Sequence, residues 1–197
     1  MSSDSHINQL LEAISARSCE KSYKELFVLM NEQLVSFALA ILKSSEDAEE
    51  VVSDFFINLW VKRSSLRALE KPKLYLFIGV KNQALNQLRA NKRSQPPQLD
   101  DWEIRLSSVF FNPEEMAISA EMVKRIMAAV NQLPPKCRMI FRLIKEDGLK
   151  YAEVAQLLDV SVKTVESQMA IALRRIRSCL EFKNEFPEIH SLLTQKK

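Results

Sequence analysis

The stretch from Tyr151 to Arg177 has the pattern of two short amphipathic helices joined by a tight turn. Apolar residues recur at helical spacing on both sides of Asp159 and Val160, which fit the turn. Ser161 follows and can cap the second helix by accepting a hydrogen bond from one of its first backbone N–H groups. The predicted buried stripe consists of Ala152, Val154, Ala155, Leu157, Leu158, Val162, Val165, Met169, Ala172, Leu173 and Ile176. The pattern predicts a helix-turn-helix, which restricts this part of the chain to a small helical domain.

The outward side of the second predicted helix is polar near its start and cationic further along. In a DNA-binding helix-turn-helix, the first residues of this helix contact base edges in the major groove. The residues at these positions are Lys163, Thr164, Glu166, Ser167 and Gln168. Arg174, Arg175 and Arg177 follow, and we expect them to contact phosphates. The alternative is a helical hairpin whose polar face is only solvated.

Glycine is almost absent from the chain, with two among 197 residues. Tight hairpin turns depend on glycine, so the sequence has little material for antiparallel sheets. Good helix formers such as Leu, Ala, Lys and Glu are common instead. We therefore predict an all-α fold made of two small helical domains.

Apolar periodicity divides the chain into two helical blocks. The first occupies residues 23–93 and follows an N-terminal helical extension, residues 1–22. The second occupies residues 116–181 and precedes a C-terminal tail, residues 182–197. Residues 94–115 lack periodicity and contain several prolines and acids, which predicts an acidic linker between the domains.

Three helices are expected in the first block. The stripe of the first extends from Leu26 to Leu42. The second occupies Asp47 to Trp60, after a helix-start signal at Ser44. Its polar side consists of Asp47, Glu50, Asp54 and Asn58. After a polar loop, a third helix can begin at Pro72.

The charges of this block are segregated along the sequence, although the net charge of +3 is modest. Five acids fall between Glu46 and Asp54, whereas residues 71–95 contain six cations and no acid. The cations are Lys71, Lys73, Lys81, Arg89, Lys92 and Arg93. This segregation predicts two kinds of partner.

The cysteines and histidines indicate neither catalysis nor a metal site. Cys19, Cys137 and Cys179 are far apart in the sequence, and we expect each to be a small core residue. His6 and His190 lie near the termini without a nucleophile or metal-binding residue beside them, and no glycine-rich phosphate loop occurs. We expect no catalytic residues, no enzymatic activity, no cofactor and no metal.

Targeting and membrane signals are also missing from the sequence. The N-terminus lacks a cationic region followed by a long apolar run. Nowhere do about 18 apolar residues occur together, which is the length needed to cross a bilayer. We expect a cytoplasmic protein without direct membrane insertion.

The order of these segments resembles a known family. An acid-rich helix (DAEEVVSDFFINLW), a polar loop, a basic helix (PKLYLFIGVKNQALNQLRANKR), an acidic linker and a helix-turn-helix block (LPPKCRMIFRLIKEDGLKYAEVAQLLDVSVKTVESQMAIALRRIR) follow one another. This order is similar to that of bacterial RNA polymerase sigma factors of the sigma-70 family, in the extracytoplasmic-function (ECF) group. The likeness extends from about residue 23 to 180. It is greatest to the iron-citrate-type branch, which membrane anti-sigma proteins regulate.

The resemblance implies a role for each domain. A sigma region 2-like domain at residues 23–93 would bind core RNA polymerase and the −10 element, and a sigma region 4-like domain at residues 116–181 would bind the −35 element. The contacts with core polymerase would be made by Asp47, Glu50, Asp54 and Asn58, on the β′ clamp. The −10 contacts would be made by Lys73, Lys81, Asn82, Asn86, Arg89, Lys92 and Arg93. The −35 contacts would be made by Lys163, Thr164, Glu166, Ser167, Gln168, Arg174 and Arg175.

Further partners are implied in the same way. These are the β flap of polymerase, promoter DNA and an anti-sigma protein held at a membrane. The loop of residues 62–73 matches the family's loop that captures a base flipped from the non-template strand, and Tyr75 or Phe77 could add stacking. Helical spacing makes Phe77 at least as good a core residue.

The function implied is that of an ECF-type sigma factor, which binds core polymerase and directs promoter-specific initiation. One alternative is a free-standing helix-turn-helix regulator, whose first block dimerises or senses a ligand and which binds palindromic DNA without polymerase. Another is an interaction module that sequesters a different regulator. The basic stretch of residues 71–93 makes a poor ligand pocket and disfavours the first alternative, and the patterned recognition helix disfavours the second.

Overall fold

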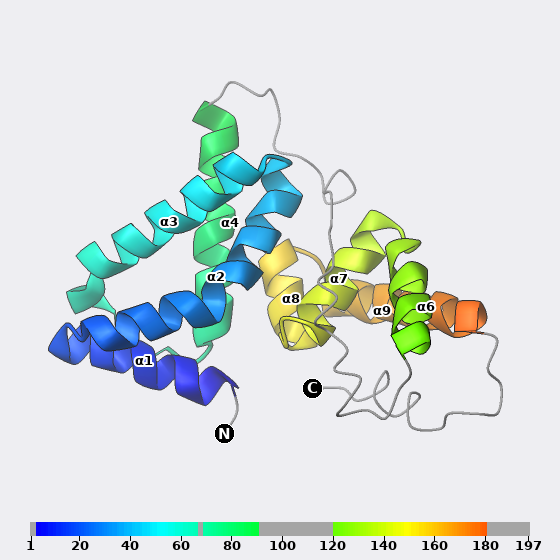
Figure 1. Ribbon diagram of the computed structural model, residues 1–197, viewed down its shortest axis with the longest axis horizontal. Helices are drawn as coiled ribbons and strands as arrows, with labels where there is room; N and C mark the ends of the chain where they lie inside the picture. Colours follow the sequence, from blue (N-terminus) through cyan, green and yellow to red (C-terminus); the bar gives the residue numbers. More distant parts are fainter. Residues whose placement is uncertain (1–2, 67–68, 91–119, 181–197) are drawn as a thin grey trace. The chain divides into compact units, whose positions relative to one another are not determined.

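The computed structural model describes residues 3–66, 69–90 and 120–180 (Figure 1). The chain divides into two compact units, Met1–Gln98 and Leu99–Lys197. Every regular element in the described ranges is helical, which confirms the predicted all-α fold.

Several predictions from the sequence fall outside these ranges. They concern the acidic linker, the C-terminal tail, and the cations Lys92 and Arg93. Their structure is therefore not described.

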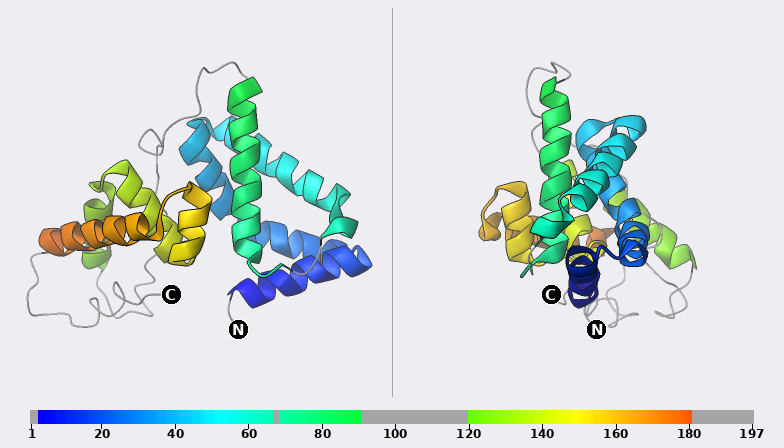
Figure 2. Two further views of the ribbon diagram at one scale, coloured as in Figure 1. Left: turned by 180° about the vertical axis from the view of Figure 1, so that it is seen from behind. Right: turned by 90° about the vertical axis from the view of Figure 1, so that its left-hand side faces the viewer.

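In the described part of the first unit, helix α2 (Glu20–Leu42) lies at the centre. It packs against α1 (Ser3–Arg17), α3 (Ser45–Val61) and α4 (Pro72–Ala90), as Figures 1 and 2 show. A short 3-10 helix, η1 (Arg63–Ser65), follows α3. The N-terminal helix α1 belongs to the core of this unit, to which it contributes Ile7, Leu10, Leu11 and Ile14.

Helix α2 is the one described helix that is long and apolar enough to cross a membrane, by length and composition alone. Its apolar residues nevertheless pack inside the unit. The buried ones are Leu26, Met30, Leu34, Phe37, Ala38, Ala40, Ile41 and Leu42. Leu29, predicted to belong to this stripe, is exposed instead. The composition of α2 is thus that of a central core helix.

Several helix ends in the described part of the chain adopt a left-handed backbone conformation without glycine. Among the described residues, three that are not glycine have positive φ angles: Ser18 at 48°, Lys43 at 62° and Asp159 at 55°. Lys43 ends α2, and the neighbouring Ser44 caps α3 by accepting a hydrogen bond from the backbone N–H of Asp47 at 3.2 Å. The predicted start of α3 is therefore confirmed, within one or two residues.

Gly79 is required by the close approach of α4 to α3. A Cβ atom at this position would overlap the Phe55 ring at Cε2 and lie 3.0 Å from Cδ2. Phe55 is buried and packs edge-on against Phe56, at 5.7 Å between ring centroids. The ring therefore has little freedom to move away.

In the described part of the second unit, α9 (Val162–Leu180) packs against α6 (Ala120–Asn131), α7 (Pro135–Lys145) and α8 (Tyr151–Leu158). Pro135 opens α7, as predicted from the sequence. The turn between α8 and α9 also matches the prediction. Ser161 Oγ accepts a hydrogen bond from the backbone N–H of Thr164 at 3.0 Å, which caps α9.

Two predictions for the buried stripe of the helix-turn-helix are wrong. Ala152 is exposed, and Val162 is 43% exposed because it is the first residue of α9 and lies outside the packed turns. The residue buried beside Ala152 is Glu153. Its Oε2 accepts a hydrogen bond from the backbone N–H of Lys150 at 2.8 Å, so the carboxylate closes the start of α8.

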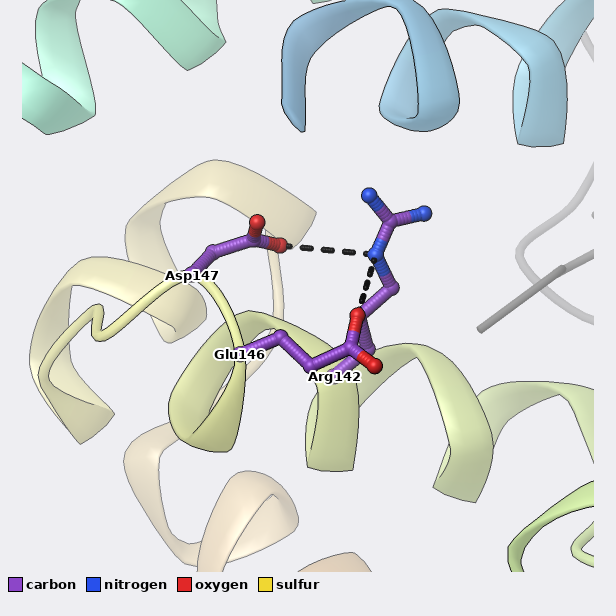
Figure 3. Close-up of polar contacts among 3 residues, drawn as sticks. All are labelled: Arg142, Glu146 and Asp147. Atoms are coloured by element: carbon purple, nitrogen blue, oxygen red, sulfur yellow. Dashed lines mark ion pairs between the residues drawn. The ribbon is translucent and has the colours of Figure 1, made fainter. Parts of the chain in front are cut away.

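A buried ionic cluster forms the turn between α7 and α8 (Figure 3). Arg142 Nε lies 3.3 Å from Glu146 Oε2 and 3.6 Å from Asp147 Oδ2. Arg142 is 3% exposed and Asp147 1%. The backbone carbonyl of Arg142 also accepts hydrogen bonds from the N–H groups of Glu146 and Asp147, and Gly148 follows with a φ of 70°. Two carboxylates thus surround one guanidinium at the turn.

We expect Gly79→Ala to destabilise the first unit by about 1 kcal/mol. Overpacking against Phe55 costs about 1–3 kcal/mol, and the better helix propensity of alanine returns about 1 kcal/mol. Denaturant unfolding followed by Trp60 fluorescence, in a Trp102→Phe background, measures this change. In the presence of Phe55→Leu, which makes room, Gly79→Ala should become neutral or stabilising. A loss that persists there would rule out the steric explanation.

Removal of the Arg142 guanidinium should be more severe. Arg142→Met leaves two carboxylates without their cation in a buried setting, and breaking such a cluster costs about 3–5 kcal/mol. We expect an early loss of helical circular dichroism on denaturation of the full chain. Adding Asp147→Asn and Glu146→Gln to this variant removes the stranded charges and should recover part of the stability. No recovery would show that the lost packing of Arg142 is the cause.

Candidate nucleic-acid and partner interfaces

The acidic side of α3 faces away from the core of the first unit. Glu50, Asp54 and Asn58 are exposed and Asp47 is half-buried. Gln87 of α4 reaches this side, where its Nε2 donates hydrogen bonds to Asp47 Oδ1 at 3.3 Å and to Glu50 Oε2 at 3.4 Å. Two of the predicted contact residues are therefore already joined to the neighbouring helix.

Two apolar residues of α3, Ile57 and Val61, extend the same side and were not predicted from the sequence. Ile57 is 57% exposed and Val61 is 66% exposed. With Glu50 and Asp54 they are spaced by four, three and four residues, the spacing that keeps side chains on one stripe of a helix. We call Glu50, Asp54, Ile57 and Val61 the α3 seam. It is acidic in its first half and apolar in its second.

The polar side of α4 carries Asn82, Asn86 and Arg89, all exposed and spaced by four and three residues. Arg89 Nη1 donates a hydrogen bond to Asn86 Oδ1 at 3.0 Å, which orders both side chains. Lys81 is half-buried on the same helix. These four residues form a polar surface free of acids on α4.

Other residues predicted for this surface lie elsewhere. Lys73 is only 7% exposed, so its ammonium group has little surface to offer to a phosphate. Phe77 is fully buried and packs against Phe37 at 5.1 Å between ring centroids, which makes it a core residue. Tyr75 is exposed and is the aromatic ring that α4 leaves available for stacking.

The outward side of α9 presents most of the predicted recognition residues. The exposed ones are Lys163, Glu166, Ser167, Arg174 and Arg175. Thr164 and Gln168 are half-buried. The helix-turn-helix therefore directs polar side chains outward from its second helix, as the sequence predicted.

Several of these side chains are held by bonds within the unit. The Thr164 hydroxyl lies 2.8 Å from Ser161 Oγ, and Ser167 Oγ donates to the Lys163 carbonyl at 2.8 Å. Gln168 Oε1 accepts a hydrogen bond from the buried thiol of Cys137 at 2.7 Å. The side chain of Gln168 is thus held against α7, a contact that its spacing in the sequence did not suggest.

A tyrosine of α8 borders this surface. Burial of the Tyr151 ring raises the pKa of its hydroxyl, and the negative charge of Glu166 raises it further. The phenol therefore stays protonated at neutral pH and can donate a hydrogen bond at the edge of the recognition helix.

The described thiols and acids form no obvious chemical centre. Cys137 is buried as predicted, but Cys19 is only half-buried, at the start of α2. A hydrogen bond with Ser22 lowers the pKa of the Cys19 thiol. Within the described ranges, no group of three or more His, Cys, Asp or Glu side chains could hold a metal ion.

Comparison with known proteins covers more than half of the chain. Residues 27–94 match the family described as Sigma-70 region 2, and residues 123–176 match Sigma-70, region 4. The ECF RNA polymerase sigma-E factor of Escherichia coli (strain K12) is 27% identical over 170 residues, which cover 82% of this chain and 88% of that protein.

Two solved structures share the fold. The sigma factor RpoE of Bartonella quintana, in complex with the anti-sigma factor NepR, has a TM-score of 0.52 at 21% identity, covering 83% of this chain and 99% of that one. CnrH, in complex with the cytosolic domain of CnrY, has a TM-score of 0.52 at 18% identity and covers 90% and 99% of the respective chains.

For the α9 surface, we expect Arg174→Ala to weaken DNA binding to a similar degree on all sequences. A phosphate contact carries no base information, and its loss should lower the salt dependence, the slope of log K against log[salt], by about one. Binding titrations at several salt concentrations measure both effects. Lys124→Ala, an exposed cation on α6, is the matched control. A changed base preference in Arg174→Ala would contradict the phosphate assignment.

Proposed function

Because this chain belongs to the sigma-70 family and is a sigma factor of the ECF group, we propose that it uses the α3 seam to bind core polymerase and the surfaces of α4 and α9 to read promoters. As an ECF sigma factor it binds core RNA polymerase and directs transcription initiation by recognising −35 and −10 elements. Its role is that of a specificity subunit, so we assign it no catalytic step. The observation that carries this function is the presence of regions 2 and 4, in this order, in one chain.

The α3 seam suits a coiled-coil partner. Its four-three-four spacing is that of a helix packing along another helix, and its exposed Ile57 and Val61 can supply the apolar contact. The acids Glu50 and Asp54 then pair with cations and fix orientation and register. We assign this seam, with Asp47 and Asn58 at its edge, to the β′ clamp of polymerase.

For the −10 element we propose contacts by Asn82 and Asn86. Their amides can bond base edges, and exposed Arg89 supplies a cation for the backbone. Lys81, Lys92 and Arg93 stay in this proposal as phosphate contacts. Lys73 was predicted from the sequence to contact the −10 element. Because its side chain is buried, we leave it out of this proposal.

For the −35 element we propose the first turns of α9. Lys163, Glu166 and Ser167 are exposed there, and Glu166 can accept a hydrogen bond from a cytosine amino group. Thr164 and Gln168 complete the surface, with Arg174 and Arg175 on phosphates. We further assign the β flap of polymerase as a partner of this second unit.

We also propose regulation by an anti-sigma protein. RpoE of Bartonella quintana is bound to the anti-sigma factor NepR and CnrH to the cytosolic domain of CnrY, and an exposed acidic and apolar seam is a surface that an inhibitor could cover. Membership of the iron-citrate-type branch, with a membrane-held anti-sigma protein, is a narrower proposal that rests on the order of the sequence motifs. The chain would act in the cytoplasm.

The first test is complex formation between the purified chain and bacterial core polymerase. Size-exclusion chromatography at moderate salt should give a one-to-one complex, and it needs no knowledge of the promoter. A folded chain that does not bind core polymerase would instead favour the free-standing helix-turn-helix regulator.

We expect the pair Glu50→Lys and Asp54→Lys to weaken this complex by about 1.4–2.8 kcal/mol, roughly ten- to hundredfold in Kd, because attraction is replaced by repulsion. The matched control is Glu20→Lys with Glu32→Lys, which makes the same charge change at exposed positions of α2.

The apolar half of the seam can be tested separately. Ile57→Ser with Val61→Ser should weaken the complex at all salt concentrations, whereas the effect of the charge reversal should shrink as salt screens it. Normal binding by both pairs would show that core polymerase does not use this seam.

A further inference from the structure

We infer that Ser15 of helix α1, together with Ser18 just after this helix, positions residues Arg63–Leu66 at the start of the loop between α3 and α4. The match to Sigma-70 region 2 begins at residue 27, so it assigns α1 no role. What the loop binds, an unpaired base of the −10 element, rests on the proposed function. What holds the loop follows from contacts in the first unit.

Ser15 makes the shortest of these contacts. Its Oγ donates a hydrogen bond of 2.6 Å to the backbone carbonyl of Leu66, 51 residues further along the chain. The hydroxyl is half-buried on the side of α1 that faces the loop. A bond to a backbone carbonyl fixes the path of the main chain, whatever side chains the loop carries.

Arg63 makes the second contact, with Ser18 just after the end of α1. Its Nε donates a hydrogen bond to Ser18 Oγ at 2.9 Å, and its Nη1 donates to the carbonyl of Trp60 at 2.8 Å. The guanidinium carbon also lies 4.5 Å from the centre of the Trp60 ring. Arg63 is thus bonded to Ser18 and to the end of α3, so we assign it a structural role in the loop.

The same part of α1 and the loop also share a groove next to the two polar contacts. A shallow groove of about 190 Å³ runs along α1 beside the loop. Its walls are formed by Asn8, Leu11, Glu12, Ser15, Ala16, Leu66 and Leu69. Leu66 and Leu69 therefore line the same groove as these residues of α1.

Positioning matters here because base capture is costly. Extruding a base costs a few kcal/mol, which contacts with the unpaired base must offset. Residues that have to be ordered at the same moment also lose conformational entropy, and the contacts of Arg63 and Leu66 reduce this cost for the start of the loop. We therefore expect α1 to raise the rate of promoter opening without touching DNA.

The test uses holoenzyme reconstituted from core polymerase and the full chain. Its probe is a promoter that the wild-type holoenzyme selects from a randomised DNA library, with 2-aminopurine in the −10 element to report unpairing. Ser15→Ala should slow opening about five- to tenfold, the value of one lost hydrogen bond. Ser15→Thr keeps the hydroxyl and should open at nearly the wild-type rate. Ser18→Ala should slow opening in the same direction.

Two controls separate positioning from a general loss of structure. Ser45→Ala changes an exposed serine at the start of α3, outside the loop, and should leave opening unchanged. Core binding by Ser15→Ala should match that of the wild type, and its free energy of unfolding should fall by no more than about 1 kcal/mol, so that the variant stays folded at the assay temperature. Opening at the wild-type rate by both Ser15→Ala and Ser18→Ala would overturn the inference, as would a loss of opening fully explained by unfolding. Failure of the wild-type chain to form holoenzyme would instead overturn the proposed function.

Discussion

The aromatic packing of α3 against its neighbours decides which side of α3 is left for a partner. Phe56 packs on Phe27 of α2 at 4.9 Å between ring centroids, and Trp60 packs on Tyr23 at 5.0 Å. On the side of α4, Phe55 occupies the space that Gly79 leaves open. With three rings fixed in this way α3 cannot rotate about its axis, so the α3 seam must face outward. The proposed polymerase surface is therefore a consequence of the core behind it.

The second unit depends on a different kind of constraint. The cluster of Arg142, Glu146 and Asp147 lies where α7 gives way to α8, and a buried cluster of this kind adds little stability unless all its members are present. The role of the cluster is to fix the geometry of the turn. The cluster and Gly148 together fix the direction in which α8 begins, and α8 and the Ser161 cap then set where α9 starts. The proposed recognition surface thus depends on a charged cluster that is buried behind it in the same unit.

Local patterns were sufficient to predict much of this architecture. Helical spacing and capping residues predicted α3, the turn at Asp159 and the outward polar side of α9, because these features depend on neighbours within one or two turns. The failures involve contacts distant in sequence. The hydrogen bond from Ser15 to Leu66 spans 51 residues, and that from Cys137 to Gln168 spans 31. Exposed Ile57 and Val61 were missed because, in a sequence, an apolar residue at helical spacing looks the same in a core and at an interface.

The hydrogen bonds of Gln87 have a consequence for how such a protein can change over generations. Gln87 is only one residue from Asn86 on α4, and yet its amide bonds Asp47 and Glu50 on α3. A substitution at Gln87 would therefore disturb the acidic side of α3 as well as the polar side of α4. Among the described contacts, no hydrogen bond joins Asn82 or Asn86 to α3. If these asparagines contact the −10 element as proposed, they can change with fewer consequences for α3 than Gln87 can, because Gln87 is bonded to α3.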